Sequence, residues 1–285
     1  MPKESTARGT LYLVATPIGN LQDITLRAID VLKEVDVIAC EDTRHTQKLL
    51  TYFGISKPTV SYHDHNERER AMEIVAKLKS GQRVAVVTDA GMPGICDPGY
   101  RVVALAVQQG VPVVPVPGAS ALVLALAASG LPTDAFGFGG FLPAKSGQRR
   151  EVLAEIAGSS RTEMFYEAPY RIVEAFEDLV DVLGGGRRVV VARELTKLHE
   201  EFLRGRAEEV LANLKARGEI KGEITLLVGK ADETAAPVVA KVSLRARMEQ
   251  VMREESLDEK AALKKVAKEF GLGKSEAYRQ WQRGK

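Results

Sequence analysis

Residues 83–99 read Arg-Val-Ala-Val-Val-Thr-Asp-Ala-Gly-Met-Pro-Gly-Ile-Cys-Asp-Pro-Gly. The apolar run at its start predicts a short strand that is buried on both faces. The strand ends in a segment rich in glycine and proline that carries two aspartates, Asp89 and Asp97. Glycine lets a main chain approach a ligand closely, and open α/β sheets hold ligands at the carboxyl ends of their strands. The stretch therefore predicts a ligand-binding loop, against the alternative of a plain turn.

Short β-branched runs alternate with helical patterns on both sides of this strand. We expect strands at 11–15, 36–40, 59–62, 83–88 and 111–116, and helices at 24–34, 43–53, 67–80 and 99–109. The strands read as continuous apolar runs, which is typical of a sheet covered on both faces. The alternation predicts an α/β fold whose N-terminal domain, residues 1–118, has a mostly parallel sheet.

A second set of elements follows. Strands are expected at 134–140, 163–166, 188–193 and 223–229, and helices at 119–129, 148–156, 169–183 and 207–216. This set predicts a C-terminal α/β domain with a mixed sheet over residues 119–232. A polar linker of small residues at 231–238 is expected to precede a basic helical tail over residues 240–285.

Composition narrows the class of protein. Two cysteines among 285 residues give no disulfide framework, and no apolar run approaches the roughly 20 residues that cross a bilayer. The start of the chain lacks the apolar segment of a secretory signal, so we expect a cytoplasmic protein. Residues 241–285 hold 12 Lys and Arg against 7 Asp and Glu. Such a tail predicts contact with a polyanion, against the alternative of a solvated helical segment.

Two segments carry basic side chains that are candidates for contact with nucleic-acid phosphates. In the tail, helices at 257–270 and 275–281 resemble a helix-turn-helix unit. Their candidate contacts are Lys264, Lys268, Lys274 and Arg279, with a small helical bundle as the alternative. Residues 136–150 run from glycines and aromatics to Lys145, Arg149 and Arg150. They predict either a mobile phosphate-gripping loop or an ordinary strand end followed by a solvated helix start.

Strand ends in the first domain deliver residues 15–20, 61–67, 88–99 and 116–120, and four such loops imply one crevice. The glycine pattern of a dinucleotide site and the Walker phosphate loop are both missing from these loops. His63 and His65 have no further ligands at suitable spacing, so we expect no metal.

Several motifs occur together in a fixed order. They are Thr16-Pro-Ile-Gly-Asn-Leu21, Glu41-Asp-Thr-Arg44, His63-Asp-His-Asn66, the 88–99 loop, Pro117-Gly-Ala-Ser120 and Tyr166-Glu-Ala-Pro169. In this combination the chain resembles the tetrapyrrole methylase family. The resemblance implies two α/β domains with S-adenosylmethionine in the cleft between them, in a homodimer.

The resemblance also implies which residues line the donor site. In the first domain they are Pro17, Gly19, Asp89, Ala90, Gly91, Met92, Pro93, Gly118, Ala119 and Ser120. In the second they are Tyr166, Leu195, Glu223 and Thr225. Family members that methylate tetrapyrroles carry Gly-Gly-Asp-Pro where this chain has Asp-Ala-Gly-Met-Pro, which favours a different acceptor.

The implied reaction is methyl transfer to the ribose 2′-oxygen of a cytidine in small-subunit ribosomal RNA. The alternatives are a family member that acts on a tetrapyrrole or a protein side chain, and a nucleic-acid-binding protein that uses the tail. A hydroxyl acceptor needs a base, for which the candidates are Asp64, His63 and Glu41. Arg44 is expected to hold phosphate or orient a carboxylate, against simple pairing with Glu41 or Asp42. For His63, the alternative to a catalytic role is a purely structural one.

Overall fold

The computed structural model describes residues 9–231, 244–254, 257–269 and 273–282. The chain divides into two compact units, Met1–Asp232 and Glu233–Lys285. The first unit contains two sheets, and the second contains helices alone within its described residues. The α/β class expected from the sequence is confirmed. Apart from Ala231, the expected linker lies outside the described residues.

The first sheet is parallel throughout. Its strands are β1 (Leu11–Val14), β2 (Val37–Cys40), β3 (Thr59–Ser61), β4 (Val84–Val87) and β5 (Val113–Val116), in the order β3-β2-β4-β1-β5. β4, which precedes the 88–99 loop, is central and every one of its residues is buried. The sheet places the ends of β4, β1 and β5 side by side, with β3 at the far edge.

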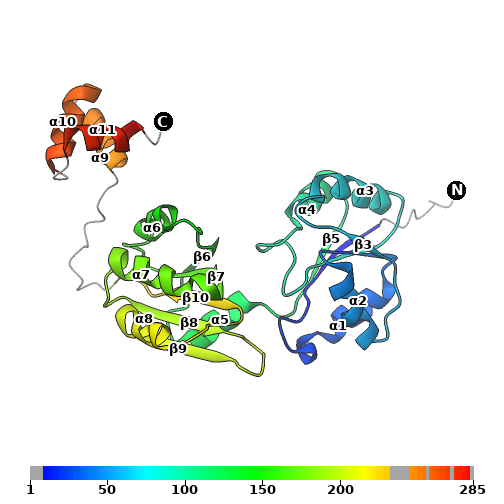
Figure 1. Cartoon of the computed structure of the whole chain (residues 1–285). Coiled ribbons are helices and arrows are strands. Elements are labelled where there is room, and N and C mark those ends of the chain that lie inside the picture. Colours follow the sequence, from blue (N-terminus) through cyan, green and yellow to red (C-terminus); the bar gives the residue numbers. More distant parts are fainter. Residues whose placement is uncertain (1–8, 232–243, 255–256, 270–272, 283–285) are drawn as a thin grey trace. The chain divides into compact units, whose positions relative to one another are not determined.

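Helices cover both faces of this sheet (Figure 1). They are α1 (Leu26–Glu34), α2 (Thr43–Tyr52), α3 (Glu67–Lys79) and α4 (Tyr100–Gln108), with a short 3-10 helix at Leu21–Asp23. Alternate residues of a strand face opposite sides, so Val84 and Val86 pack with α3 and α4. Ala85 and Val87 pack with α1 and α2. This two-sided burial is why the strand reads as an unbroken apolar run.

The second sheet is mixed, as expected. Its strands are β6 (Phe136–Phe141), β7 (Thr162–Glu167), β8 (Arg188–Arg193), β9 (Glu201–Arg206) and β10 (Ile224–Val228), in the order β6-β7-β10-β8-β9. Only the β6–β7 pair is parallel. Helices α6 (Ser146–Glu155), α7 (Ile172–Leu183) and α8 (Ala207–Ala216) pack on one face, and α5 (Ala121–Ser129) packs on the other. A 3-10 turn, Pro169–Arg171, precedes α7.

Strand β9 has no counterpart among the strands expected from the sequence. Its residues, Glu-Phe-Leu-Arg-Gly-Arg, include three charged side chains and a glycine, which disfavour a strand assignment. The strand pairs only with β8, at the edge of the sheet. Charged residues are common on edge strands because they discourage pairing with another chain. The prediction failed because the position in the sheet, rather than local propensity, decides this strand.

The segment after α5 is a strand end and a helix start. β6 has an irregular register between Phe138 and Phe141, and α6 begins at Ser146. A Cβ at Gly139 would overlap the ring of Phe165, so the glycine lets the neighbouring strand pack closely. Of the two alternatives for residues 136–150, the structure has the strand end followed by a helix start, and not the mobile loop.

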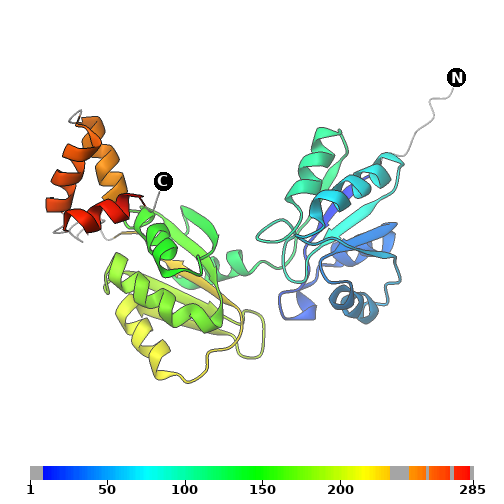
Figure 2. The ribbon, with the colours of Figure 1, turned by 45° about the horizontal axis from the view of Figure 1, so that its top comes forward.

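Within its described residues, the second unit has three helices, α9 (Leu244–Glu254), α10 (Glu259–Glu269) and α11 (Lys274–Gln282) (Figure 2). They share a small core that includes Met248, Val251, Val266 and Trp281. The sequence predicted the last two helices and missed α9. No helix among the described residues is long and apolar enough to cross a membrane.

Candidate functional site

A pocket of about 430 Å³ opens at the carboxyl end of the first sheet and extends to the second. Nine of the expected donor-site residues line it: Asp89, Ala90, Gly91, Met92, Ser120, Tyr166, Leu195, Glu223 and Thr225. Small-molecule sites typically enclose about 300–1,000 Å³. The strand-end loops therefore meet at a cavity of the right size for a nucleoside-sized ligand.

Five expected donor-site residues do not line the pocket: Pro17, Gly19, Pro93, Gly118 and Ala119. Thr16 and Gly91 exchange backbone hydrogen bonds of 2.9 and 3.1 Å, which ties the end of β1 to the 88–99 loop. A Cβ on Gly118 would lie 2.8 Å from the Cβ of Ala15, so this glycine permits a close approach of two strand ends.

Carboxylates gather on the side of the pocket formed by the first domain. Glu41, Asp89 and Asp97 all line it, and the hydroxyl of Thr88 donates to Glu41 Oε2 at 3.0 Å. The pKa of Asp97 is raised to about 6, chiefly by burial. The charges of Glu41, Asp89 and Asp64 also raise this pKa, while a hydrogen bond with Thr88 lowers it. Sequence reasoning placed Asp97 in the ligand loop but missed it as a site residue.

The other expected catalytic residues lie outside the lining. Among them, Asp64 is near enough for its charge to act on the pKa of Asp97. The backbone N–H of His63 donates to Asn66 Oδ1 at 2.9 Å, which fixes the turn after β3. Because β3 is separated from β4 by β2, its loop starts about 10 Å from the end of β4.

Arg44 pairs with Asp42, one of the two alternatives for this side chain. Its Nη2 lies 2.9 Å from Asp42 Oδ2, yet the arginine side chain is 88% exposed. Hydrogen bonds from the Arg44 side chain and backbone hold the pKa of Asp42 at about 2, well below its usual range. The Arg44 guanidinium keeps a solvent-facing side, and it lines a second, shallower groove along α2.

Backbone strain concentrates around the pocket. Among the described residues, Cys96, Glu194 and Thr196 are the non-glycine residues with positive φ, at 61°, 53° and 66°. Cys96 lines the pocket, and the other two flank Leu195, which also lines it. Left-handed conformations of non-glycine residues are costly and cluster at ligand sites.

The strained turn at Glu194 clamps one wall of the pocket. Glu194 Oε1 accepts hydrogen bonds from the backbone N–H of Glu223 at 3.0 Å and from Lys197 Nζ at 2.8 Å. Gly222, another lining residue, has φ 93°, and a Cβ there would overlap the Glu194 side chain. Gly222 and Glu194 therefore fix the start of β10, which delivers Glu223 and Thr225 to the pocket.

Replacing Gly222 with alanine should lower the free energy of unfolding by at least about 1 kcal/mol, because the added Cβ meets both an unfavourable φ and the Glu194 side chain. Chemical denaturation measures this. Gly218→Ala is the matched control, because nothing lies within 4 Å of a Cβ there, and it should change the value by less than about 0.5 kcal/mol. Equal effects of the two substitutions would contradict the clamp.

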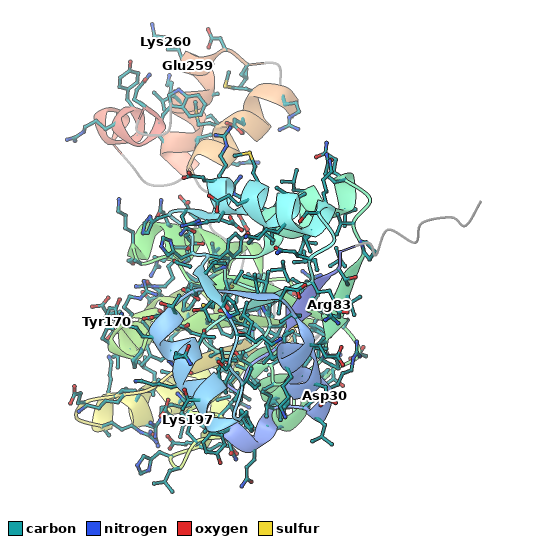
Figure 3. All side chains as sticks on the ribbon, turned by 90° about the vertical axis from the view of Figure 1, so that its right-hand side faces the viewer. Asp30, Arg83, Tyr170, Lys197, Glu259 and Lys260 are labelled. Carbon is teal, nitrogen blue, oxygen red and sulfur yellow. The ribbon has the colours of Figure 1, made fainter. Side chains whose placement is uncertain are left out.

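Tyr166, from β7, closes the pocket with an uncharged phenol. Burial raises its pKa to about 12. Its ring packs edge-on against Phe138 and Phe141, with ring centroids 4.9 and 5.5 Å away. Figure 3 labels Tyr170, which is exposed and comes one residue after the lining residue Pro169.

The structure contradicts one of the expected RNA contacts. Lys145 is exposed, but Arg149 is 2% exposed and its Nε and Nη2 both lie 2.7 Å from Asp178 Oδ2. The prediction that Arg149 contacts RNA is therefore corrected to a buried ion pair. Arg150 is partly exposed and pairs with Asp178 and with Asp181.

The tail contacts remain predictions. Lys264, Lys268 and Arg279 are exposed on α10 and α11, and Lys274 begins α11, with its side chain outside the described ones. Within the described residues, no group of three or more His, Cys, Asp or Glu side chains is arranged to hold a metal ion.

Residues 10–211 match the family model of the Tetrapyrrole (Corrin/Porphyrin) Methylases. The fold is shared with diphthine synthase, at a TM-score of 0.63 and 19% identity over 78% of this chain and 90% of that one. It is also shared with uroporphyrin-III-C-methyltransferase from Thermus thermophilus, at a TM-score of 0.55 and 22% identity over 78% and 95%. The chain belongs to the Tetrapyrrole (Corrin/Porphyrin) Methylases.

Its curated relatives include proteins named Ribosomal RNA small subunit methyltransferase I. The one from Halalkalibacterium halodurans is 46% identical over 273 residues, which cover 95% of this chain and 94% of that protein. The one from Vibrio cholerae is 55% identical over 219 residues, 76% of each chain. The one from Escherichia coli O157:H7 is 49% identical over 237 residues, 82% and 83%. The resemblance stated from the motifs is confirmed.

Proposed function

We propose that this chain is an S-adenosylmethionine-dependent methyltransferase of small-subunit ribosomal RNA, acting in the cytoplasm on the ribose 2′-oxygen of a cytidine. The observation that carries the proposal is the pocket of about 430 Å³, which collects nine of the residues that the family resemblance implies for the donor site. The relatives named Ribosomal RNA small subunit methyltransferase I support the choice of acceptor.

The pocket suits the donor chemically. Ile18, Ala192 and Leu195 offer apolar surface for a nucleoside base, and the carboxylates of Asp89 and Glu223 suit hydroxyl and ammonium donors. The side chain of Glu167 is fully buried and lines the pocket, and its Oε2 has no hydrogen-bond partner. A uroporphyrin-III C-methyltransferase of the same fold has been solved with S-adenyl homocysteine.

When bound, S-adenosylmethionine supplies a methyl group already activated on a sulfonium sulfur. The chain must then orient the acceptor hydroxyl and take up its proton. Asp97 is the group we assign to this proton, because it lines the pocket and its pKa is raised to about 6. A base with a pKa near the working pH combines a useful ionised fraction with proton affinity. Glu41 stays in the site as a neighbouring carboxylate, and Asp64 and His63 lie outside its lining.

A methyl-transfer assay tests the function. Small ribosomal subunits from a strain lacking this protein are incubated with the chain and radiolabelled S-adenosylmethionine, and the labelled nucleotide is mapped. We expect label on one cytidine ribose of the RNA. Label on a protein or a tetrapyrrole, or donor binding without label on the subunit, would overturn the assigned acceptor.

An exposed apolar face of helix α5 supports a homodimer. This helix has no charged residue, and its outward positions Val123, Leu124, Ala127 and Ala128 are exposed, Val123 by 58%. Exposed apolar stretches of this kind mark interaction sites. We assign a second copy of the chain to this surface, since the family resemblance implies a dimer.

Replacing Leu124 with glutamate should therefore yield a monomer, because it places a charge in the apolar interface. Light scattering after size exclusion measures the mass. Met72→Glu is the matched control, since Met72 is an exposed apolar residue on α3 and its replacement should leave the mass unchanged. A wild-type chain that is monomeric at micromolar concentration would contradict the assignment.

A further inference from the structure

A second groove runs along the surface of α2. It is lined by Arg44, Gln47, Lys48, Thr51 and Tyr52, which we call the α2 face, together with Thr43 and Thr59. Arg44, Lys48 and Tyr52 are four residues apart, so they stand in one row on the helix. All five α2-face residues are exposed. Figure 3 shows α2 at the surface of the N-terminal domain.

The charge of this helix is one-sided. α2 contains Arg44, His45 and Lys48 and no acidic residue. The nearest carboxylate, Asp42, caps the helix and pairs with one side of the Arg44 guanidinium. By contrast, α7 contains only acidic charges. Lys48 and the solvent-facing side of the Arg44 guanidinium, one helical turn apart, form a basic surface that attracts a polyanion.

Tyr52 adds an aromatic platform. Its side chain is 65% exposed, although burial of an aromatic ring is strongly favourable. The ring lies edge-on against that of Phe53, with centroids 4.9 Å apart and planes at 81°. Aromatic side chains beside basic ones are typical of surfaces that bind single-stranded nucleic acid, because bases stack on the rings.

The α2 face follows a lining residue of the main pocket closely along the chain. Glu41 lines that pocket, and the backbone N–H of Asp42 donates to Asp89 Oδ1 at 3.3 Å. From Arg44 to Tyr52 the helix advances about 12 Å. That length matches a few nucleotides at about 3.4 Å each.

We propose that the α2 face binds the RNA strand next to the modified nucleotide, with Arg44 and Lys48 on phosphates and Tyr52 under a base. This inference rests on the proposed function, which makes the substrate an RNA. It assigns the face to unpaired RNA, since an A-form helix offers its bases poorly to an aromatic side chain.

Titration of isolated small-subunit ribosomal RNA into the full-length chain, at several salt concentrations, tests the proposal. Tyr52→Ala should weaken binding about 5- to 100-fold, because one stacked base is lost, and Tyr52→Phe should keep it. Lys48→Gln should lower the salt dependence of log K by about 0.7, the value for one phosphate contact. Lys33→Gln, an exposed lysine on α1, is the matched control and should change neither quantity.

Kinetics on small subunits separate docking from chemistry. Both α2 variants should raise KM for the subunit while kcat and the Kd for S-adenosylmethionine stay at wild-type values. Unchanged RNA affinity in Tyr52→Ala and Lys48→Gln would overturn the proposal. A loss of affinity for assembled subunits without a loss for isolated RNA would also overturn it, because it would assign the face to a protein. A change in the oligomeric mass of the variants would overturn it as well. The titration needs no methyl transfer, so it judges the α2 face even if the wild-type chain fails the methylation assay.

Discussion

Replacing Asp97 with asparagine should lower the rate of methyl transfer about 10²- to 10⁴-fold, the usual contribution of a positioned base. The asparagine keeps the shape of the side chain and cannot take the proton of the acceptor hydroxyl. Donor affinity should change little, which calorimetry with S-adenosylmethionine checks. Asp64→Asn removes the same charge outside the pocket lining and is the matched control. Full activity of the Asp97 variant would end its assignment as the base.

The pH dependence of the same reaction gives a sharper readout. Because the pKa of Asp97 is about 6, the single-turnover rate should rise with pH below about 6 and level off above it. The rising limb should vanish in Asp97→Asn. It should move to lower pH in Asp64→Asn, because the charge of Asp64 helps to raise the pKa of Asp97. A limb that stays in place in both variants would assign the titration to another group.

Unfolding of the protein is not expected to explain the lower rate of methyl transfer in Asp97→Asn. The folded chain holds the proton of Asp97 more tightly than the unfolded chain, whose carboxyl has the ordinary value of 3.8. Between pH 3.8 and about 6 this group therefore contributes less stability as pH rises. At pH 8 the asparagine variant, which avoids the buried charge, should unfold no more readily than the wild type. Thermal unfolding checks this directly.

Replacing Asp178 with alanine should lower the free energy of unfolding by about 3–5 kcal/mol. The substitution leaves the Arg149 guanidinium, 2% exposed, without its carboxylate. Asp181→Ala is the matched control. Asp181 is 65% exposed and pairs only with the partly exposed Arg150, so its loss should cost less than about 1 kcal/mol. Chemical denaturation at pH 7 measures both.

The double variant Arg149→Met with Asp178→Leu separates the two possible sources of this loss. Removing both charges should recover most of the stability, because replacing a whole buried ion pair by apolar groups is close to neutral. A double variant as unstable as Asp178→Ala would show that packing, and not the orphaned charge, is responsible. Burial alone would raise the pKa of Asp178, but hydrogen bonds from Ser146, Arg149 and Arg150 hold it below its usual value. This pair's stabilisation should therefore be lost as the pH falls into the acid range.

Strand and helix positions were readable from the sequence because the pattern that defines them is local. The run at 83–88 became β4, and the helix expected at 207–216 has those bounds in the structure. The failures have local causes too. β9 is too charged and α9 too polar to stand out, and each is decided by the neighbours against which it packs.

The sequence predicted the site residues that lie on loops after neighbouring strands. Asp89 and Ser120 follow β4 and β5, which flank β1, and both reach the pocket. Asp64 follows β3, which lies two strands away from β4, and it does not line the pocket. Strand order comes from long-range pairing, and nothing in the sequence next to a loop reports it.

The sequence by itself determined the α/β class, the loops that carry the site and the family of the chain, because apolar periodicity and motif order are properties of neighbouring residues. Only the tertiary structure decided that Asp97 lies half-buried among other carboxylates, that Arg149 is buried against Asp178, and that Tyr52 stays exposed beside Lys48. Burial and charge partners set the chemistry of a side chain, and both come from residues far away along the chain.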